Sequence, residues 1–326
     1  MKLTQLRALV AIARAGSIQE AANLIGLSQP ALSKTVRALE QEMGAPLLER
    51  GARGVSLTEY GRVVVKRSLT IEREIDRLNE EVGWLKAEFA GRLTIGFTPL
   101  AGGVILASAV AQLRRLHPAV DVQLIEVRPY QILEGLRESS FDLGLLTLHG
   151  ATSLPGFVTH TLASYPTRLV AGGRRETTEL SIEKVLQEEW IETELADKPQ
   201  SYIQTLAASA GLNPPARILH CTSISLAVEL AAELGAICGM AAHAVAYFQK
   251  KIEDGVLTPL NIDSPLPTMN CIAAYSDGDR LTPAARELAK ILRILGREAT
   301  LRFGAVAHDS NSAPSAAQEN LVRHSA

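Results

Sequence analysis

Residues 15–50 read AGSIQEAANLIGLSQPALSKTVRALEQEMGAPLLER, and this stretch decides the fold of the first part of the chain. Gly16 and Gly26 predict the ends of two short helices, because glycine readily adopts the left-handed conformation that closes a helix. Ser17 can cap the second of these helices, with Glu20 placed to complete a capping box. We expect three apolar residues of this helix to be buried: Ala21, Leu24 and Ile25.

A third helix is predicted over residues 29–43, because Ser28 can cap it and Pro30 fits its first turn. Its apolar residues are spaced four, three and four apart and therefore form one stripe. They are Leu32, Val36, Leu39 and Met43. Two short helices joined by a turn that contains glycine make a helix-turn-helix.

The other face of the third helix carries small, polar and basic side chains. Pro30, Lys34, Arg37 and Gln41 lie on this face, Ser33 lies on its flank, and Gln29 lies nearer the core side, directly after the cap at Ser28. Glutamine, serine and lysine can reach base edges in the major groove of DNA, and arginine can bind guanine or phosphate. Such a face can also be ordinary solvated surface, but the pair of capped helices favours DNA binding.

Charge is unevenly distributed along the 326 residues, although the formal net charge is only −2. Residues 1–67 hold ten Lys and Arg against five Asp and Glu, and the rest of the chain holds 23 against 30. The total excludes a uniformly basic, histone-like protein. A basic first segment joined to an acidic remainder indicates a nucleic-acid contact at one end.

A long helix is predicted from Thr58 and Glu59 to about residue 86. Its small and apolar residues alternate at spacings of four and three: Val64, Ser68, Ile71, Ile75, Leu78, Val82 and Leu85. Such a heptad seam could cover the helix's own domain, but its regularity favours pairing with a second copy. A dimer would present two recognition helices to a partly palindromic DNA site.

Several motifs follow one another without gaps over residues 6–61: AGS, AA, LSQPALSK, LEQEMGAPLLER and LTEYG. This segment resembles the DNA-binding domain of the LysR-type bacterial transcriptional regulators. The resemblance implies a winged helix-turn-helix in which Gln29, Pro30, Ser33 and Lys34 face the groove. It also implies that residues 50–55 form the wing, with Arg50 and Arg53 against the DNA backbone or minor groove. The long helix would join two such domains in a homodimer, which usually assembles into a homotetramer.

After residue 91, strands alternate with helices, which predicts an α/β fold with mainly parallel strand pairing. Strands are expected near residues 92–98, 121–127, 142–148, 167–172, 190–193, 217–221, 237–241, 256–262 and 269–275. The resemblance implies two hinged subdomains similar to periplasmic binding proteins. The first would comprise residues 91–163 and 268–300, and the second residues 164–267.

The predicted organisation is therefore a winged helix-turn-helix domain at 1–58, a linker and dimerisation helix at 59–88, and an α/β effector-binding domain at 91–300. Residues 301–326 lack periodicity and are rich in Ala, Ser and Asn. We expect this tail to be disordered.

Four points of the α/β region carry polar side chains after a strand or at a helix start, where a small anion can bind. The residues are Thr98 and Pro99, Thr147, Ser201 and Tyr202, and Thr222 and Ser223. The resemblance implies that these positions line a cleft for a small, anionic metabolite. Each residue could instead be a helix cap or a packing residue. The sequence offers no certain cationic anchor for an anion.

Motifs for serine hydrolases, zinc proteases, P-loops and dinucleotide sites are absent from the sequence, so we expect no enzyme, cofactor or metal site. The cysteines, Cys221, Cys238 and Cys271, are too few for a disulfide framework and fit a reducing cytoplasm. The apolar stretch 234–248 is too short to span a bilayer. The first residues read as an amphipathic helix rather than a signal peptide.

These observations predict a cytoplasmic transcription regulator that binds promoter DNA and responds to a small-molecule effector, with no membrane partner. Two alternatives stay open. One is a solute-binding or enzymatic α/β protein with an accessory helical domain. The other is a constitutive DNA-bound repressor without an effector.

Overall fold

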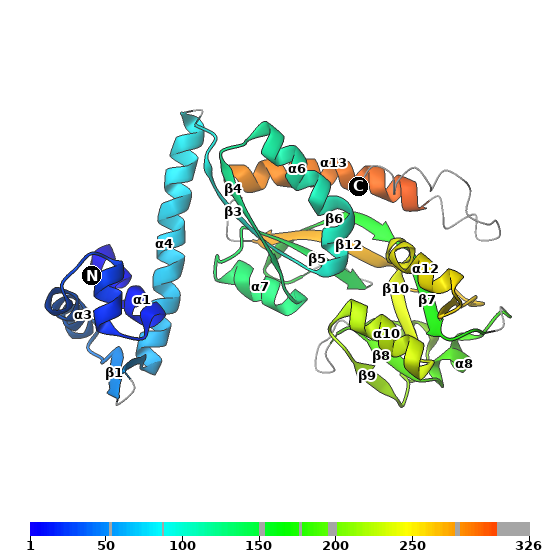
Figure 1. Cartoon of the computed structure of the whole chain (residues 1–326). Helices are drawn as coiled ribbons and strands as arrows, with labels where there is room; N and C mark the ends of the chain where they lie inside the picture. Colours follow the sequence, from blue (N-terminus) through cyan, green and yellow to red (C-terminus); the bar gives the residue numbers. More distant parts are fainter. Residues whose placement is uncertain are drawn as a thin grey trace.

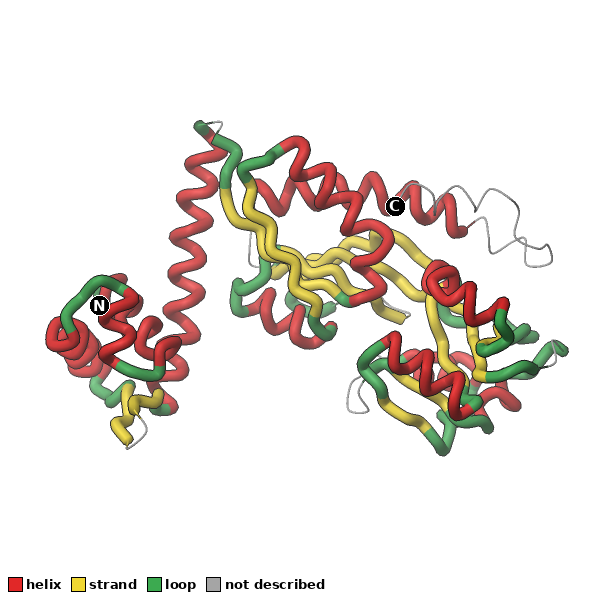
Figure 2. The backbone as a smooth tube through the Cα atoms, viewed as in Figure 1, coloured by secondary structure: helices red, strands yellow, loops and turns green. Residues whose placement is uncertain are grey.

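The computed structural model describes residues 1–51, 54–86, 88–149, 154–175, 178–194, 201–277 and 281–304. They form a small helical domain, one long helix and two α/β lobes (Figure 1). The long helix stands between the helical domain and the first lobe, as the tube in Figure 2 shows. No described helix is both long and apolar enough to cross a membrane.

The N-terminal domain contains three helices followed by a two-stranded hairpin. Its elements are α1 (Leu3–Ala15), α2 (Ile18–Leu24), α3 (Gln29–Met43), β1 (Leu48–Gly51) and β2 (Gly54–Leu57). The Ser17 hydroxyl accepts a hydrogen bond from the Glu20 amide (3.1 Å), and the Ser28 hydroxyl accepts one from the Ala31 amide (3.4 Å). The predicted caps of α2 and α3 are thereby confirmed.

The core of this domain gathers apolar side chains from α1, α2, α3 and the residue before β1. Its larger members are Leu6, Leu9, Ile12, Leu32, Val36, Leu39 and Leu47. The expected burial of Leu24 and Ile25 is wrong, because 68% and 38% of these residues are exposed. Helix α2 ends at Leu24 and the chain turns at Gly26, so both side chains leave the face that Ala21 presents to the core. Met43, in the last turn of α3, is also exposed.

Helix α4 (Glu59–Leu85) begins at Thr58, as predicted. The Thr58 hydroxyl accepts a hydrogen bond from the Gly61 amide (2.9 Å) and donates one to the Pro46 carbonyl (2.7 Å). Gly61 permits this close approach, since a Cβ atom there would collide with the Leu47 carbonyl. The start of α4 is thus fixed to the N-terminal domain.

The predicted seam along α4 divides into two parts. Val64 packs against the core of the N-terminal domain, and Ser68 is buried. Further along, four apolar residues of the seam are exposed: Ile71, Leu78, Val82 and Leu85. The C-terminal half of α4 therefore presents an uncovered apolar stripe.

Lobe I is built on a five-stranded sheet with the order β4-β3-β5-β12-β6. Its strands are β3 (Gly91–Phe97), β4 (Val120–Glu126), β5 (Leu143–His149), β6 (Phe157–Tyr165) and β12 (Met269–Ser276). Its helices are α5 (Pro99–Ala101), the π-helix η1 (Gly102–Leu106), α6 (Ala107–Leu116), α7 (Pro129–Arg137) and α13 (Pro283–Gly304). Helices α6 and α13 cover one face of the sheet and α7 the other (Figure 1). Because β3 pairs in parallel with both β4 and β5, the carboxyl ends of these three strands share one edge.

Lobe II is built on a second sheet with the order β11-β7-β10-β8-β9. Its strands are β7 (Thr167–Gly172), β8 (Trp190–Glu192), β9 (Ile218–His220), β10 (Ile237–Ala241) and β11 (Leu257–Pro259). Its helices are α8 (Ile182–Leu186), α9 (Tyr202–Ala210), α10 (Ile224–Leu234), α11 (Ala242–Val245), the 3₁₀ helix η2 (Ala246–Phe248) and α12 (Gln249–Glu253). The chain enters lobe II after β6 and returns to lobe I at β12.

The expected dominance of parallel pairing is wrong. Antiparallel pairs join β12 to β5 and β6, and β7 to β10 and β11. Only Pro166 separates β6 in lobe I from β7 in lobe II, and β12 brings the chain back to lobe I between β5 and β6, antiparallel to both. Strand β6 itself was not predicted. It lies at the edge of its sheet and carries polar residues such as Thr159 and His160 within it.

Two boundaries also differ from the sequence prediction. Strand β6 continues to Tyr165, two residues past the expected end of the first segment. Helix α13 runs to Gly304, four residues beyond the expected end of the α/β domain. The rest of the predicted tail, residues 305–326, lies outside the described residues.

Candidate functional site

The outward face of α3 brings together most of the residues predicted to contact DNA. Ser28, Gln29, Pro30, Lys34 and Arg37 are exposed, and Ser33 is half-buried. The opposite side of the helix is buried in the core. The helix is therefore fixed through one face while the polar and basic face stays open.

Ser33 and Arg37 lie on the flank of α3 that faces the hairpin. They line a hollow together with Ile12, Ile18, Val36, Glu40 and Leu48. Gln29, Pro30 and Lys34 do not line it. The predicted DNA-binding residues of α3 thus form an outer group and a second group beside β1.

The hairpin β1–β2 occupies the position predicted for the wing. Arg50 pairs with Val55 in its register, and the Val55 amide donates to the Gly16 carbonyl (3.2 Å). This bond fixes the hairpin to the end of α1. Arg53 and the side chain of Arg50 lie outside the described residues, so the predicted contacts of both stay predictions.

In lobe I, the predicted effector-binding residues meet at the carboxyl ends of β3 and β5. The hydroxyl oxygens of Thr98 and Thr147 are 3.2 Å apart, and the Thr98 amide donates to the Leu145 carbonyl (2.9 Å). Pro99 begins α5 directly after Thr98. Residues 49 positions apart in the chain therefore form one polar corner.

His149, the last residue of β5, connects this corner to lobe II. Its ring centroid lies 4.9 Å from that of Tyr202, at the start of α9. Burial lowers the pKa of His149 to about 4, so the imidazole is neutral at neutral pH. The contact brings predicted residues of both lobes to the interface between the lobes.

Ser201 and Tyr202 have structural roles in lobe II. The Ser201 hydroxyl accepts a hydrogen bond from the Gln204 amide (3.2 Å) and donates one to Glu192 Oε2 (2.8 Å). Tyr202 is buried against Gly239, where a side chain would strike the phenol ring. Both observations favour the alternative of cap and packing residue. Their contact with an effector remains a prediction.

Glu192 occupies the start of α9, where an anionic ligand was expected. This residue is only 4% exposed, and its Oε2 atom also accepts a hydrogen bond from the Ile203 amide (3.1 Å). A carboxylate at a helix N-terminus is stabilised by the free amides and the helix dipole. The protein's own carboxylate therefore fills this anion site.

Thr222 and Ser223 precede α10. The Ser223 hydroxyl caps the helix by accepting a hydrogen bond from the Leu226 amide (3.4 Å), and it is exposed. The Thr222 carbonyl accepts a hydrogen bond from Arg128 (2.5 Å). The second contact reaches across from lobe I.

Arg128 is a cationic residue at the interface between the lobes that sequence reasoning missed. It precedes α7 in lobe I, and its guanidinium donates to the carbonyls of Thr222 and Thr193 (3.3 Å) in lobe II. The signal was available, because Arg128 follows the predicted strand 121–127 at the same sheet edge as Thr98 and Thr147. Applying the strand-end rule to this third strand would have found it.

The acidic side of the cleft contains Glu194 in addition to Glu192. Burial raises the pKa of Glu194 to about 7, which Arg128 opposes and the Glu192 carboxylate reinforces. The Glu194 carbonyl is held by the Nδ1 atom of His220 at 2.7 Å. Near neutral pH, Glu194 is therefore only partly ionised.

The three cysteines are free and buried. Burial raises the pKa of both Cys238 and Cys271 to about 12. The reactive form of a cysteine is the thiolate, which these two thiols do not form near neutral pH. Among the described residues, no group of three or more His, Cys, Asp or Glu side chains could hold a metal ion.

Comparison with known families places this architecture. Residues 3–62 match the model described as bacterial regulatory helix-turn-helix protein, lysR family. Residues 86–295 match the LysR substrate binding domain. The chain belongs to the LysR family. The resemblance seen in the sequence is thereby confirmed.

Similar proteins of known description include transcription regulators. One is the probable hydrogen peroxide-inducible genes activator of Streptomyces viridosporus, 35% identical over 176 residues. This match covers 53% of the present chain and 56% of the relative. The chain thus spans about half the length of the curated relative that it matches.

Solved LysR-family structures share the fold. Full-length OxyR from Pseudomonas aeruginosa superimposes with a TM-score of 0.65 at 20% identity, over 91% of this chain and 95% of that one. Full-length CbnR in complex with its target DNA gives a TM-score of 0.64 at 18% identity, over 90% of this chain and all of that one. At these identities the similarity shows the fold alone.

Proposed function

We propose that this LysR-family protein is a DNA-binding transcription regulator controlled by a small-molecule effector, acting in the cytoplasm on promoter DNA. The single observation that carries the proposal is the arrangement of α3 on the N-terminal domain. This helix is capped, buried on one face, and open on the other with Gln29, Lys34 and Arg37. A helix held in this way can enter the major groove with its N-terminal residues on the base edges.

The exposed stripe on α4 supports a homodimer. Leu78 is 61% exposed and Leu85 is 88% exposed, and both belong to the predicted heptad seam. Pairing of two α4 helices would bury these side chains, which gives roughly 25 cal/mol per Å² of apolar surface removed from water. The dimer would carry two α3 faces, and two dimers would form the tetramer that the resemblance implies.

The cleft between the lobes supports an effector site with one cationic anchor. Arg128 and the hydroxyls of Thr98 and Thr147 stand on the lobe I side. Glu192 fills the helix start on the other side, so an anionic group would bind toward Arg128 rather than at Ser201. We infer a small effector whose anionic group is held by Arg128 and whose remainder lies against the threonines.

Effector control would work by a shift in population between open and closed arrangements of the lobes. Arg128 already contacts the backbone of lobe II at Thr193 and Thr222. An effector that binds one arrangement more tightly favours it by the difference in affinity. The linker helices would then change the spacing and bend that the oligomer imposes on DNA.

Peroxide sensing by a thiol is not part of this proposal, although one relative is described as a peroxide-inducible genes activator. Peroxide oxidises the thiolate form of an accessible cysteine. Here the cysteines are buried, and the two with resolved shifts have strongly raised pKa values. We propose a non-covalent effector instead.

The test is fluorescence anisotropy of the full chain with the DNA directly upstream of its coding sequence, against a scrambled duplex of equal length. Lys34→Ala and Arg37→Ala remove cations from α3, and Arg115→Ala removes an exposed cation from α6 as the matched control. We expect preference for the upstream DNA, and a loss of roughly 10-fold or more in the α3 variants alone.

Salt dependence separates two kinds of contact. A variant that weakens binding equally on both duplexes and makes the salt slope shallower has lost a phosphate contact. A variant that weakens only the preferred duplex has lost base reading. Absence of any preference in the wild type, together with turnover of a bound metabolite, would favour the alternative of an enzymatic α/β protein.

A further inference from the structure

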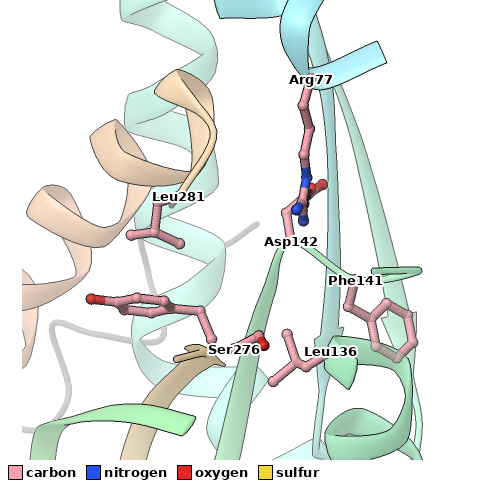
Figure 3. A pocket seen from close by; sticks show the side chains of 7 residues that line it. Arg77, Leu136, Phe141, Asp142, Ser276 and Leu281 are labelled. Atoms are coloured by element: carbon pink, nitrogen blue, oxygen red, sulfur yellow. Dashed lines mark ion pairs between the residues drawn. The ribbon is translucent and has the colours of Figure 1, made fainter. Parts of the chain in front are cut away.

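A buried cluster of charged residues lies where α4 meets lobe I. It consists of Arg73, Arg77 and Glu80 from α4 and Asp142 from the start of β5. The Nη2 atom of Arg73 lies 2.6 Å and 2.7 Å from the two carboxylate oxygens of Asp142. Arg77 Nη2 lies 3.6 Å from Asp142 Oδ1. Figure 3 shows Arg77 reaching from α4 to Asp142.

The same cluster holds the backbone of β3 at two residues. Asp142 Oδ2 accepts a hydrogen bond from the Thr94 amide in β3 (2.8 Å). The Arg92 amide donates to Glu80 Oε1 (3.0 Å), and Arg73 donates to the Arg92 carbonyl (3.2 Å). The helix is therefore bonded to the amino ends of β3 and β5 through side chains and main chain together.

The cluster is desolvated. The side chain of Asp142 is 1% exposed, and that of Arg73 is 14% exposed. Burial raises the pKa of Glu80. For Arg73, burial is the largest single influence and acts to lower the pKa, but the hydrogen bond and charge of Asp142, together with the charges of Glu80 and Asp76, outweigh it and the pKa is raised. Desolvation of charges offsets much of their attraction, so a buried network of this kind adds little stability over an apolar contact.

What such a network does provide is a defined orientation. An apolar contact tolerates sliding and rotation, whereas a guanidinium bonded to both oxygens of a carboxylate accepts only a narrow range of geometry. A displacement of α4 on lobe I would leave buried charges without partners. The cost of that displacement holds the helix in one position.

The strands that begin at this cluster end at the candidate effector site. Strand β3 runs from Gly91 to Phe97 and is followed directly by Thr98. Strand β5 begins at Leu143 and contains Thr147 near its end. Each strand spans seven residues, or about 20 Å. One pair of parallel strands therefore connects the polar corner of the cleft to the linker helix.

We propose that Asp142 and Arg73 are positioning residues that fasten α4 to β3 and β5, so that α4 and lobe I move as one body. A movement of lobe I relative to lobe II then displaces the linker helix directly. The consequence for DNA rests on the proposed function, but the joint itself does not.

The test measures the geometry of the joint without DNA or effector. Spin labels are placed on cysteines introduced at two exposed positions, Arg67 in α4 and Ala111 in α6, in the full chain. The native cysteines are buried, which favours selective labelling at the introduced sites. Labelled chain is diluted with unlabelled chain, so that pulsed electron paramagnetic resonance reports distances within one chain.

Two variants separate positioning from stability. Asp142→Asn keeps the shape of the side chain and removes its charge. The double variant with Arg73→Met and Asp142→Leu replaces the ion pair by an apolar contact, leaves Arg77 bonded to Glu74 (2.7 Å) and removes the Arg73 partner of Glu80 (3.3 Å). We expect both variants to broaden the distance distribution about two-fold or more at temperatures well below their thermal midpoints, where each is still folded.

The matched control is Lys66→Gln, which breaks the pair between Lys66 and Glu138 at the same contact of α4 with lobe I. Lys66 is 57% exposed, so this pair contributes little and the distribution should keep its wild-type width. A wild-type width in Asp142→Asn, or in the double variant, would overturn the proposal. A broadened distance distribution in the variants of a protein that binds no DNA would support the proposed joint between α4 and lobe I and refute the proposed function as a transcription regulator.

Discussion

The predicted DNA-binding surface of α3 and the proposed effector site between the lobes both combine hydroxyls with basic groups, but they are assembled in different ways. On α3 the residues belong to one helix and its cap, within ten positions of the chain. In the cleft, Thr98, Arg128 and Thr147 come from three strand ends, and Glu192 comes from the other lobe. A site on one helix depends on that helix alone. A site between lobes depends on every element that places them.

The two regions also have separate cores. The N-terminal domain packs around Leu39, whereas the part of lobe II behind the cleft packs around Leu206, and the two side chains belong to different clusters. The comparison therefore predicts that damage to one region leaves the other folded. The following predictions run from the largest expected effect to the smallest.

The largest effects come from truncating the two cores. Leu39→Ala and Leu206→Ala each remove a fully buried side chain, which typically costs about 2–5 kcal/mol of unfolding free energy. Both tryptophans, Trp84 and Trp190, lie outside the N-terminal domain. Leu39→Ala should lower the temperature of the first unfolding transition seen by far-ultraviolet circular dichroism, and it should abolish DNA binding. The unfolding transition followed by tryptophan fluorescence should keep its midpoint.

Leu206→Ala is the matched change in lobe II and should lower the temperature of the tryptophan transition. A lowered tryptophan transition in Leu39→Ala as well would show that the two regions unfold as one unit. That result would break the comparison.

The next effect concerns Glu192, which has no counterpart on α3. Glu192→Ala leaves the Ser201 hydroxyl and the Ile203 amide without their acceptor, which should cost about 1–3 kcal/mol. Glu192→Gln keeps an acceptor oxygen and should recover most of this loss. Chemical denaturation of both variants measures the difference.

Ser28→Ala is the control on α3, where the cap is local. Loss of its bond to the Ala31 amide should cost about 1 kcal/mol. If Glu192→Ala costs no more than Ser28→Ala, the long-range carboxylate adds nothing to the start of α9.

A smaller effect should appear in the pH dependence of stability. Burial raises the pKa of Glu194 from its ordinary value of 4.5 to about 7 in the folded protein. Between these values the folded protein binds more protons than the unfolded chain, so this group lowers stability as pH rises through that window. Glu194→Gln should therefore be more stable than wild type above pH 7, and the gain should vanish toward pH 4.5.

His149 acts in the opposite direction, because its folded pKa of about 4 lies below the ordinary 6.5 and its contribution grows as pH rises. It is present in both proteins, so the difference between wild type and Glu194→Gln isolates Glu194. Thermal midpoints measured across the range provide the test. A difference that is constant with pH would contradict the raised pKa.

The smallest expected effect is that of hydrogen peroxide. The three thiols are buried, and burial holds the pKa of Cys238 and Cys271 near 12. Native protein treated with peroxide should keep its three titratable thiols after denaturation and its affinity for DNA. Loss of thiol titre at the same rate as in the unfolded chain would contradict the burial of these cysteines.

The sequence was sufficient where neighbours in the chain are also neighbours in space. The caps at Ser17, Ser28 and Thr58 were predicted from residues within a few positions, and each forms the expected bond. The face of α3 followed from helical periodicity. The burial of Leu24 and Ile25 was predicted wrongly, because the same periodicity was continued to the last residue of α2 and the residue after it, where both side chains are exposed.

In the cleft, sequence reasoning found the residue types but not their roles. Ser201 was predicted to bind an anionic ligand, but its hydroxyl donates a hydrogen bond to Glu192 instead. Arg128 was passed over although it follows a predicted strand, and its bonds to the carbonyls of Thr193 and Thr222, 65 and 94 positions away, cannot be predicted from its neighbours in the chain. Strand β6 was missed because an edge strand with polar residues lacks the apolar run of a central one.

By itself the sequence determined the capped helices of the first domain, the polar face of α3, the apolar seam of α4 and the alternation of strands and helices after residue 91. Each depends on hydrophobic period, caps and turns, which act over one or two turns of helix or along one strand. The tertiary structure alone decided the antiparallel pairs around β12, the bond of Arg128 across the cleft, and the joint between Arg73 and Asp142. Arg73 and Asp142 lie 69 residues apart in the chain and Arg128 and Thr222 lie 94 apart, so these contacts depend on strand order and on desolvation, which no local pattern encodes.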